Sequence, residues 1–283
     1  MKKTSSNAEA SLQACIDYLT PLDKVLVAFS GGVDSTLLIN LAKKALPDGA
    51  FALSLKNPLI HDFEIEYAIE ETERIGIPHF ILEFSPLALV KLRLNPPDRC
   101  YHCKLEIFGV ILKKAKKLGI EHVMDGTNAD DVGDYRPGMR ALSELGIKSP
   151  FLELGIGKEE IREMSRVLGI SGAERSPLAC LATRFPYNET ITPEKIDRIK
   201  KAELILRGHG FKTFRVRYLG KALNMVKIEV GVSELSRLLS PDLLGNINSD
   251  IKRLGFSSVT LDLGGYRPGS MNEGLKELDD EKP

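Results

Sequence analysis

The sequence predicts an α/β protein with an open, mostly parallel sheet and helices on both faces, followed by a smaller α+β domain. Short apolar runs alternate with helical stretches through the first half of the chain. Polar or glycine-rich turns follow several of these runs. Later in the chain, two neighbouring segments alternate polar and apolar residues, which is the pattern of strands with one buried face.

Repeated strand–helix units account for the first half of the chain. The run 24–29 is short and rich in Val, as a buried parallel strand should be. Ligands bind beyond the carboxyl ends of such strands, so the turns at those ends are candidate sites. The expected strands are 24–29, 50–55, 79–84 and 121–125, and the expected helices are 8–19, 34–45, 63–75 and 104–118.

The remaining part of the chain predicts a second domain. An irregular segment with two prolines begins near residue 171, and Thr192 and Pro193 then form a helix start. Two alternating segments joined near Gly220 predict a pair of strands. The expected elements are helices 193–207 and 246–254 and strands 213–218, 225–230 and 258–262. We predict one domain over 1–188, a second over 189–272 and a frayed tail over 273–283.

Charge and hydropathy argue against some classes of protein. The 39 basic and 39 acidic residues balance, whereas proteins that bind long nucleic acid usually carry a basic excess. The apolar runs are far shorter than the roughly 20 residues that cross a bilayer. The first residues lack the apolar run of a signal peptide. We expect a cytoplasmic protein with neither a membrane nor a nucleic acid as partner.

The turn after strand 24–29 has the features of an anion site. Its sequence is Ser30-Gly31-Gly32-Val33-Asp34-Ser35. Two glycines let the backbone approach a charged group, and the next helix points its free N–H groups into the turn. The ordinary P-loop pattern is absent. The alternative is a tight strand–helix turn with an N-capping Ser or Asp.

Cysteines supply a second candidate site. Cys100 and Cys103 have Cys-x-x-Cys spacing before the expected helix 104–118, and Cys180 lies in another loop-like segment. Two thiolates cannot complete a tetrahedral metal site, but three can bind three irons of a 4Fe-4S cluster. His102 could instead complete a zinc site. The residues alone leave open a metal site, a redox pair and buried thiols; Cys15, on an amphipathic helix, reads as a buried hydrophobe.

Charged residues of the second domain form a third candidate site. Arg215 and Arg217 alternate along one expected strand, so both side chains leave the same face and could bind phosphate together. Glu203 lies on the preceding helix and Glu229 on the next strand. The alternative is a solvated, salt-bridged sheet face of little energetic value.

Further polar residues follow the expected strand 121–125. Gly126 and Asn128 are candidates for an adenine or ribose pocket, with an ordinary turn as the alternative. Arg136 and Arg184 are candidates for a substrate carboxylate or phosphate, with a surface arginine as the alternative.

The glycine-rich turn resembles the PP-loop of the ATP pyrophosphatase superfamily, which cleaves ATP between the α- and β-phosphates and forms an adenylate. Four further segments resemble the LarE family of ATP-dependent sulfur transferases, and the resemblance runs roughly from Val25 to Asn272. These segments are 95–104, 134–138, 184–187 and 259–267.

The resemblance implies a specific reaction and its cofactors. ATP with Mg²⁺ would adenylate the carboxylates of pyridinium-3,5-biscarboxylic acid mononucleotide, and sulfur would displace AMP to give thiocarboxylates for the nickel-pincer nucleotide cofactor of lactate racemase-type enzymes. Some family members sacrifice one cysteine as the sulfur source. Others use three cysteines to hold a 4Fe-4S cluster that carries a sulfide, and this chain has the three-cysteine pattern.

The resemblance also assigns residues to roles. Its catalytic residues are Cys180, Cys100, Cys103 and Asp34, and the three cysteines are its metal ligands. Its ATP-binding residues are Ser30, Gly31, Gly32, Asp34, Ser35, Gly126 and Asn128. Its ligands for the substrate phosphate or for an associated metal are Arg184, Glu203, Arg215, Arg217 and Glu229. A further expected acidic partner is replaced near Arg237.

Three other functions fit part of the pattern. A PP-loop tRNA thiolase would also use three cysteines, but the balanced charge argues against it. A PP-loop amidating ligase would not need the cysteines. A non-catalytic nucleotide-binding iron–sulfur protein would bind ATP without releasing pyrophosphate. For the sulfur transferase we expect a small-molecule substrate, sulfide or a sulfur donor, and a homo-oligomer.

Overall fold

The computed structural model describes residues 2–133, 137–170, 179–267 and 269. Internal contacts divide it into two compact units. Unit 1 comprises Met1–Pro86 and Asp98–Leu178, and unit 2 comprises Leu87–Pro97 and Ala179–Pro283. The domain limits after residues 188 and 272 stay a prediction.

Unit 1 is built on a parallel sheet whose four strands, among the described residues, have the order β3-β2-β1-β4. Every neighbouring pair in this sheet runs parallel. The central strand is fully buried at Val25, Leu26 and Val27, as its apolar sequence predicted. The strands are β1 (Val25–Ala28), β2 (Ala50–Lys56), β3 (His79–Glu83) and β4 (His122–Met124).

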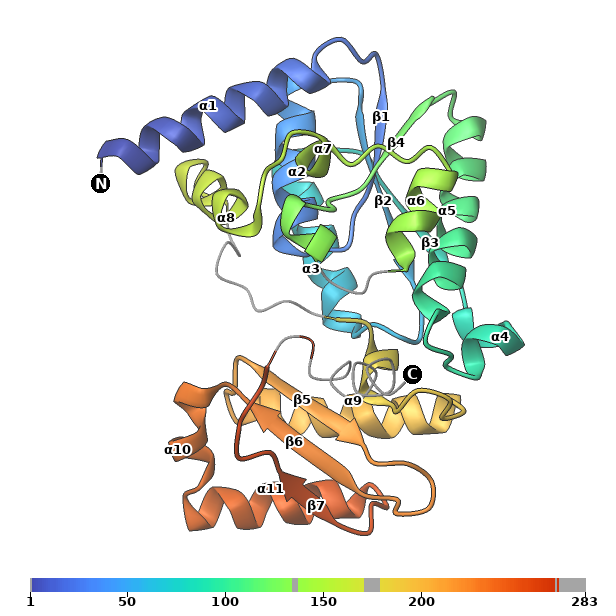
Figure 1. The fold of residues 1–283 in the computed structure, drawn as a ribbon, viewed down its shortest axis with the longest axis vertical. Coiled ribbons are helices and arrows are strands. Elements are labelled where there is room, and N and C mark those ends of the chain that lie inside the picture. The colour runs from blue at the N-terminus through green and yellow to red at the C-terminus, as the bar shows by residue number, and fades with distance from the viewer. Residues whose placement is uncertain (1, 134–136, 171–178, 268, 270–283) are drawn as a thin grey trace, which may run out of the picture. The chain divides into compact units, whose positions relative to one another are not determined.

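Helices cover both faces of this sheet, which confirms the predicted α/β class (Figure 1). One face carries α1 (Lys2–Leu19), α2 (Val33–Ala45), α3 (Asp62–Ile75), α7 (Pro150–Glu153) and α8 (Lys158–Val167). The other face carries α5 (Arg99–Lys117) and α6 (Gly138–Glu144). The short 3₁₀ helices η1 (Pro86–Ala88) and η2 (Ala129–Gly133) lie in connections.

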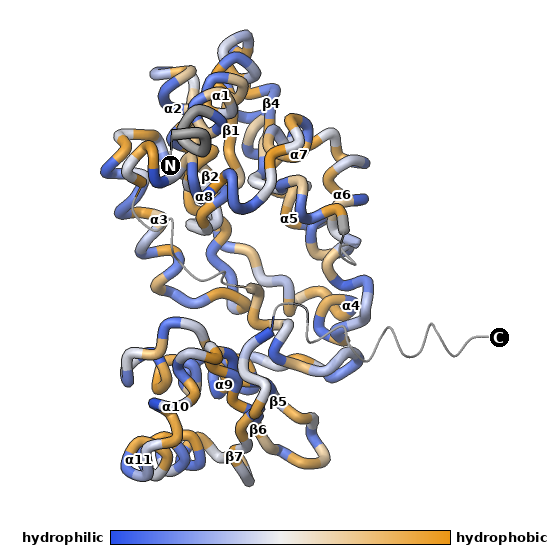
Figure 2. The backbone as a smooth tube through the Cα atoms, turned by 60° about the vertical axis from the view of Figure 1, so that its left-hand side comes forward, coloured by the Kyte–Doolittle hydropathy of each residue, from blue (hydrophilic) through white to orange (hydrophobic). Residues whose placement is uncertain are grey.

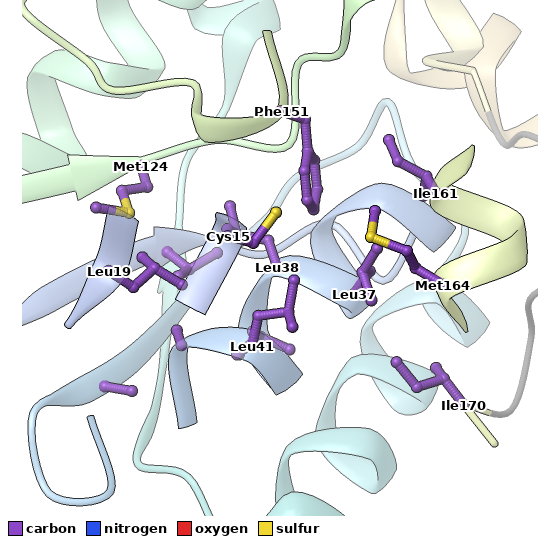
Figure 3. Close-up of a cluster of buried hydrophobic side chains, with 14 of the residues drawn as sticks. Cys15, Leu19, Leu37, Leu38, Leu41, Met124, Phe151, Ile161, Met164 and Ile170 are labelled. Carbon is purple, nitrogen blue, oxygen red and sulfur yellow. The ribbon is translucent and has the colours of Figure 1, made fainter. Parts of the chain in front are cut away.

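A large apolar cluster joins α1 and α2 to α7 and α8. Figure 3 shows Cys15 of α1 among this cluster, with Phe151 of α7 and Met164 of α8. Burial, with a smaller contribution from the charge of Glu160, raises the pKa of the Cys15 thiol to about 12. Cys15 is therefore a buried hydrophobe, as predicted.

Unit 2 contains a small mixed sheet in the order β5-β6-β7. Strand β6 pairs antiparallel with β5 and parallel with β7. The Thr192 side chain accepts a hydrogen bond from the Lys195 amide, which confirms the predicted N-cap. Orange and blue stretches alternate along α11, as expected of an amphipathic helix (Figure 2). The elements are α4 (Val90–Arg93), η3 (Leu181–Arg184), α9 (Pro193–Gly208), β5 (Phe214–Tyr218), β6 (Val226–Val230), η4 (Val232–Glu234), α10 (Leu235–Leu238), α11 (Pro241–Arg253) and β7 (Val259–Leu261).

Several helices differ from the sequence prediction. The helix expected to start at Lys104 starts at Arg99, directly after Pro96-Pro97-Asp98, since no further proline or glycine interrupts its first turns. Helices α6, α7 and α8 lie in a region for which we predicted no helix or strand. Within the part of the chain that the structure describes, no helix is both long enough and apolar enough to cross a membrane.

Candidate nucleotide and anion sites

The turn between β1 and α2, residues 30–35, is called the nucleotide loop below. Gly32 occupies the N-cap position of α2 and has no side chain that could satisfy the first-turn N–H groups. The Ser30 amide donates to Ser35 Oγ at 3.3 Å, and the two hydroxyl oxygens lie 3.1 Å apart. Thr36 Oγ1 donates to the Gly32 carbonyl at 2.9 Å. The hydroxyls thus brace the loop, while the helix end is suited to an anion.

Two glycines allow this loop to be as tight as it is. Gly31 has a φ of 72°, in the left-handed region that favours glycine. A Cβ on Gly126, after β4, would lie 2.9 Å from the Ser35 nitrogen and 3.1 Å from the Asp34 carbonyl carbon. The structure therefore brings the predicted residue Gly126 directly against the nucleotide loop, with Asn128 two residues further along the same turn.

Asp34 of the loop forms an ion pair that the sequence did not indicate. Lys158 Nζ, at the first turn of α8, lies 2.5 Å and 2.6 Å from its two carboxylate oxygens. Burial raises the pKa of Asp34, and the charge of Lys158 opposes that shift. The available signal was Gly157-Lys158-Glu159-Glu160 before Ile161 and Met164, a helix start with apolar spacing.

Asp125, at the end of β4, organises the neighbouring turn. Its carboxylate accepts hydrogen bonds from the Thr127 amide at 3.2 Å, from the Thr127 hydroxyl at 2.6 Å and from the Ser149 hydroxyl at 2.6 Å. Lys104 Nζ also donates to it at 3.4 Å. The side chain of Asn128 accepts from the Asp130 amide at 3.1 Å, so it shapes the same turn.

The Cys-x-x-Cys pair lies inside a helix, not in the turn before it. Cys100 and Cys103 belong to the first turn of α5, and a spacing of three residues places both on one helix face. Cys100 is exposed and Cys103 is partly exposed, so both contrast with the buried Cys15. The neighbouring Lys104 joins this turn to Asp125.

Cys180 belongs to unit 2, whereas the other two predicted ligands belong to unit 1. It is exposed and occupies the N-cap position of η3, where its carbonyl accepts a hydrogen bond from the Thr183 hydroxyl. Among the described residues no group of three or more His, Cys, Asp or Glu side chains is arranged to hold a metal ion. The three-cysteine ligand set therefore stays a prediction.

Unit 2 holds an arginine cluster, which consists of Arg184, Glu203, Arg215, Arg217 and Glu229. Arg184 Nε and Nη2 donate to the two oxygens of Glu203 at 2.7 Å and 3.2 Å, and both residues are 1% exposed. Arg217 Nε donates to Glu229 Oε1 at 2.6 Å. The face is salt-bridged, as the alternative expected, but it is not solvated, because four of the five groups are buried and Arg217 is only partly exposed.

The cluster has the charge of an anion site. Three arginines accompany two carboxylates, which leaves one excess positive charge. Burial lowers the pKa of Arg215, and the nearby Arg184 lowers it further, so a bound anion would relieve this repulsion. Glu229 Oε2 is buried and accepts no hydrogen bond from the residues that the structure describes.

Arg237 does not extend the arginine cluster toward a metal site. Its guanidinium donates to the His209 and Gly210 carbonyls. Both oxygens of Glu203 are already bound to Arg184. These contacts favour an anion over a metal ion at the cluster. The predicted candidate Arg136 lies outside the described residues.

Comparisons with known proteins identify the family. No protein-family model matches the chain. An uncharacterised protein of Synechocystis is 38% identical over 94% of this chain and 98% of its own length. The pyridinium-3,5-bisthiocarboxylic acid mononucleotide synthase of Lactiplantibacillus plantarum is 33% identical over 96% of both chains. The chain belongs to the LarE family.

Membership of the LarE family confirms the resemblance inferred from the sequence motifs. The tRNA-specific 2-thiouridylase of Carboxydothermus hydrogenoformans is also similar, at 26% identity over 83% of this chain and 80% of its own length. Similarity to that enzyme agrees with the PP-loop fold of unit 1. In this LarE-family chain the nucleotide loop and the arginine cluster are therefore the two candidate anion-binding sites.

Replacing Gly126 with Ala should weaken ATP binding at least about ten-fold, because the added Cβ would press on backbone atoms of the nucleotide loop that cannot move aside. Equilibrium dialysis with ATP measures the effect. Gly109→Ala in α5 is the matched control, since a Cβ there meets nothing within 4 Å. Equal affinities for the two variants would contradict the close approach of the β4 turn to the loop.

Replacing Arg184 with Met should lower the free energy of unfolding by about 3–5 kcal/mol, because it leaves the buried Glu203 carboxylate without its partner. Urea-induced unfolding measures the change. The control is Arg253→Met, whose partner Asp250 is also exposed, and it should cost less than about 1 kcal/mol. A similar small loss for both variants would show that the Arg184–Glu203 pair is not desolvated.

Proposed function

We propose that this chain is an ATP-dependent sulfur transferase that converts the carboxylates of pyridinium-3,5-biscarboxylic acid mononucleotide to thiocarboxylates, for the nickel-pincer nucleotide cofactor. The observation that carries the proposal is the 33% identity to the Lactiplantibacillus synthase along 96% of both chains. The nucleotide loop and the arginine cluster support it, because one suits a polyphosphate and the other suits a further anion.

The nucleotide loop would bind ATP through its pyrophosphate end. Gly32 leaves the first-turn N–H groups of α2 for phosphate oxygens, and Ser30 and Ser35 add hydroxyls. Mg²⁺ would accompany the phosphates, and Asp34 is the carboxylate placed to join it. Binding would bring Lys158, now paired with Asp34, close to the phosphates as well.

These groups suit adenylation. A substrate carboxylate oxygen attacks the α-phosphorus of ATP, the bond to the bridging oxygen breaks, and pyrophosphate leaves with the electron pair. Backbone N–H groups, Lys158 and Mg²⁺ would stabilise the charge on the leaving pyrophosphate. A sulfur nucleophile then attacks the acyl carbon, and AMP leaves.

The arginine cluster would hold the phosphate of the mononucleotide. Arginine binds phosphate through two parallel N–H groups, and the cluster has an arginine in excess of its carboxylates. Glu203 and Glu229 would hold Arg184 and Arg217 in place for that phosphate.

We further propose that Cys100, Cys103 and Cys180 hold a 4Fe-4S cluster. Two features suit cluster ligands. Cys100 and Cys180 are exposed, so a cluster can reach them, and Cys100 and Cys103 lie on one face of the helix. When bound, the cluster would supply sulfur to the activated acyl group. The alternative is a sacrificed Cys180 as the sulfur source. We also propose a cytoplasmic location, a homo-oligomer and a separate sulfide donor.

Pyrophosphate release tests the function. With ATP and Mg²⁺, the mononucleotide should trigger release, and Asp34→Asn should slow it at least about 100-fold because the loop loses its carboxylate. Transfer RNA with ATP should trigger none. Release driven by tRNA or by ammonia would instead favour the thiolase or the amidating ligase. Tight ATP binding without release under any of these conditions would favour a non-catalytic protein.

The visible spectrum of protein purified without oxygen tests the cluster. We expect broad absorption near about 400 nm together with iron and sulfide, and its loss in Cys100→Ala. Cys15→Ala is the matched control, because that thiol is buried and should not affect the spectrum. A colourless, iron-free protein even after reconstitution would contradict the cluster, and mass analysis of Cys180 after turnover would then test its sacrifice.

A further inference from the structure

The residue before the nucleotide loop is held by a side chain of the neighbouring strand. Phe29 follows β1, and its amide still donates to the Leu53 carbonyl of β2 at 2.8 Å. Its own carbonyl accepts a hydrogen bond from Ser54 Oγ at 2.6 Å. Phe29 is 2% exposed and Ser54 is 1% exposed. Without Ser54, this hydrogen bond to a buried carbonyl would be lost at the point where the chain turns into the loop.

The geometry of the peptide bond carries this contact into the loop. The carbonyl of Phe29 and the N–H of Ser30 belong to the same rigid, planar peptide group. That N–H donates to Ser35 Oγ at 3.3 Å. Fixing the carbonyl with Ser54 therefore fixes the direction of the Ser30 N–H, and with it the Ser30–Ser35 brace across the loop.

His79 of β3 in turn fixes the Ser54 hydroxyl. Its Nε2 lies 2.8 Å from Ser54 Oγ, and its Nδ1 lies 3.0 Å from Thr72 Oγ1 of α3. The single hydrogen of the Ser54 hydroxyl points to Phe29, so Nε2 must be the donor to Ser54. Nδ1 of the neutral ring is then an acceptor, and it shares the single hydrogen of the Thr72 hydroxyl with the Ala68 and Ile69 carbonyls, each 2.9 Å from Thr72 Oγ1. Burial lowers the pKa of His79, which favours this neutral form.

We propose that Ser54, supported by His79, is a positioning residue for the nucleotide loop. It acts through the Phe29–Ser30 peptide and does not itself contact ATP. The inference rests on the proposed function only in that the loop binds ATP. It predicts that two side chains from β2 and β3 set the affinity for ATP without changing the affinity for the second substrate.

The test is the affinity of the full chain for ATP, measured by equilibrium dialysis, together with the KM values for ATP and for the mononucleotide. Ser54→Ala should weaken ATP binding about ten-fold, as expected when one ordinary hydrogen bond no longer holds the loop. The KM for ATP should rise in parallel, and the KM for the mononucleotide should stay unchanged. A general loss of structure would instead change both.

Two variants of His79 keep the test decisive if Ser54→Ala folds poorly. His79→Gln retains an N–H that can reach Ser54 and should keep ATP affinity within about two-fold, whereas His79→Leu removes the donor and should weaken it several-fold. The matched control is Ser165→Ala, which removes another buried hydroxyl that donates to a backbone carbonyl, within α8.

The outcomes separate this inference from the proposed function. Unchanged ATP affinity in both Ser54→Ala and His79→Leu would overturn the positioning role, whatever the catalytic activity. An equal loss in Ser165→Ala would also overturn it, because the effect would then be general. Normal ATP binding without pyrophosphate release would contradict the proposed sulfur transfer, and dialysis would still decide the role of Ser54.

Discussion

The close approach between the end of β1 and the start of α2 is the constraint on which the rest of unit 1 depends. A short turn must reverse the chain, leave the N–H groups of a helix end unsatisfied by protein, and yet remain rigid. Gly31 supplies a left-handed backbone, and Gly126 leaves room beside Ser35. The hydroxyls of Ser30, Ser35 and Thr36 make the loop rigid without bulky side chains. The space at the N-terminus of α2 therefore remains suited to phosphate.

Unit 2 differs from unit 1 in that the charged groups of its arginine cluster are mostly buried. Arg184 and Glu203 are each 1% exposed, so their desolvation offsets much of their attraction. A buried ion pair of this kind adds little net stability to the fold. Together with the depressed pKa of Arg215, it favours a site that becomes electrostatically balanced only when an anion arrives.

The sequence predicted the parallel sheet and the nucleotide loop because their signals are local. A Val-rich run followed by Ser-Gly-Gly is a strand and a turn within ten residues. Lys158 was not predicted, since it pairs with Asp34 across 124 residues and only the packing of α8 beside α2 brings them together. The burial of the arginine cluster was likewise missed, because alternation along a strand shows which side chains share a face and not which face is covered.

The cysteines differ in burial, and their burial determines whether their thiols can react. Cys15 is enclosed by α1, α2 and α8, and burial raises the pKa of its thiol far above neutral pH, so it cannot act as a thiolate. Cys100 and Cys180 are instead exposed, at the first turn of α5 and beside η3. A fold that merely needed small apolar side chains would have no reason to place two thiols in solvent. Their exposure is therefore an argument for chemistry at these two cysteines that does not depend on any relative.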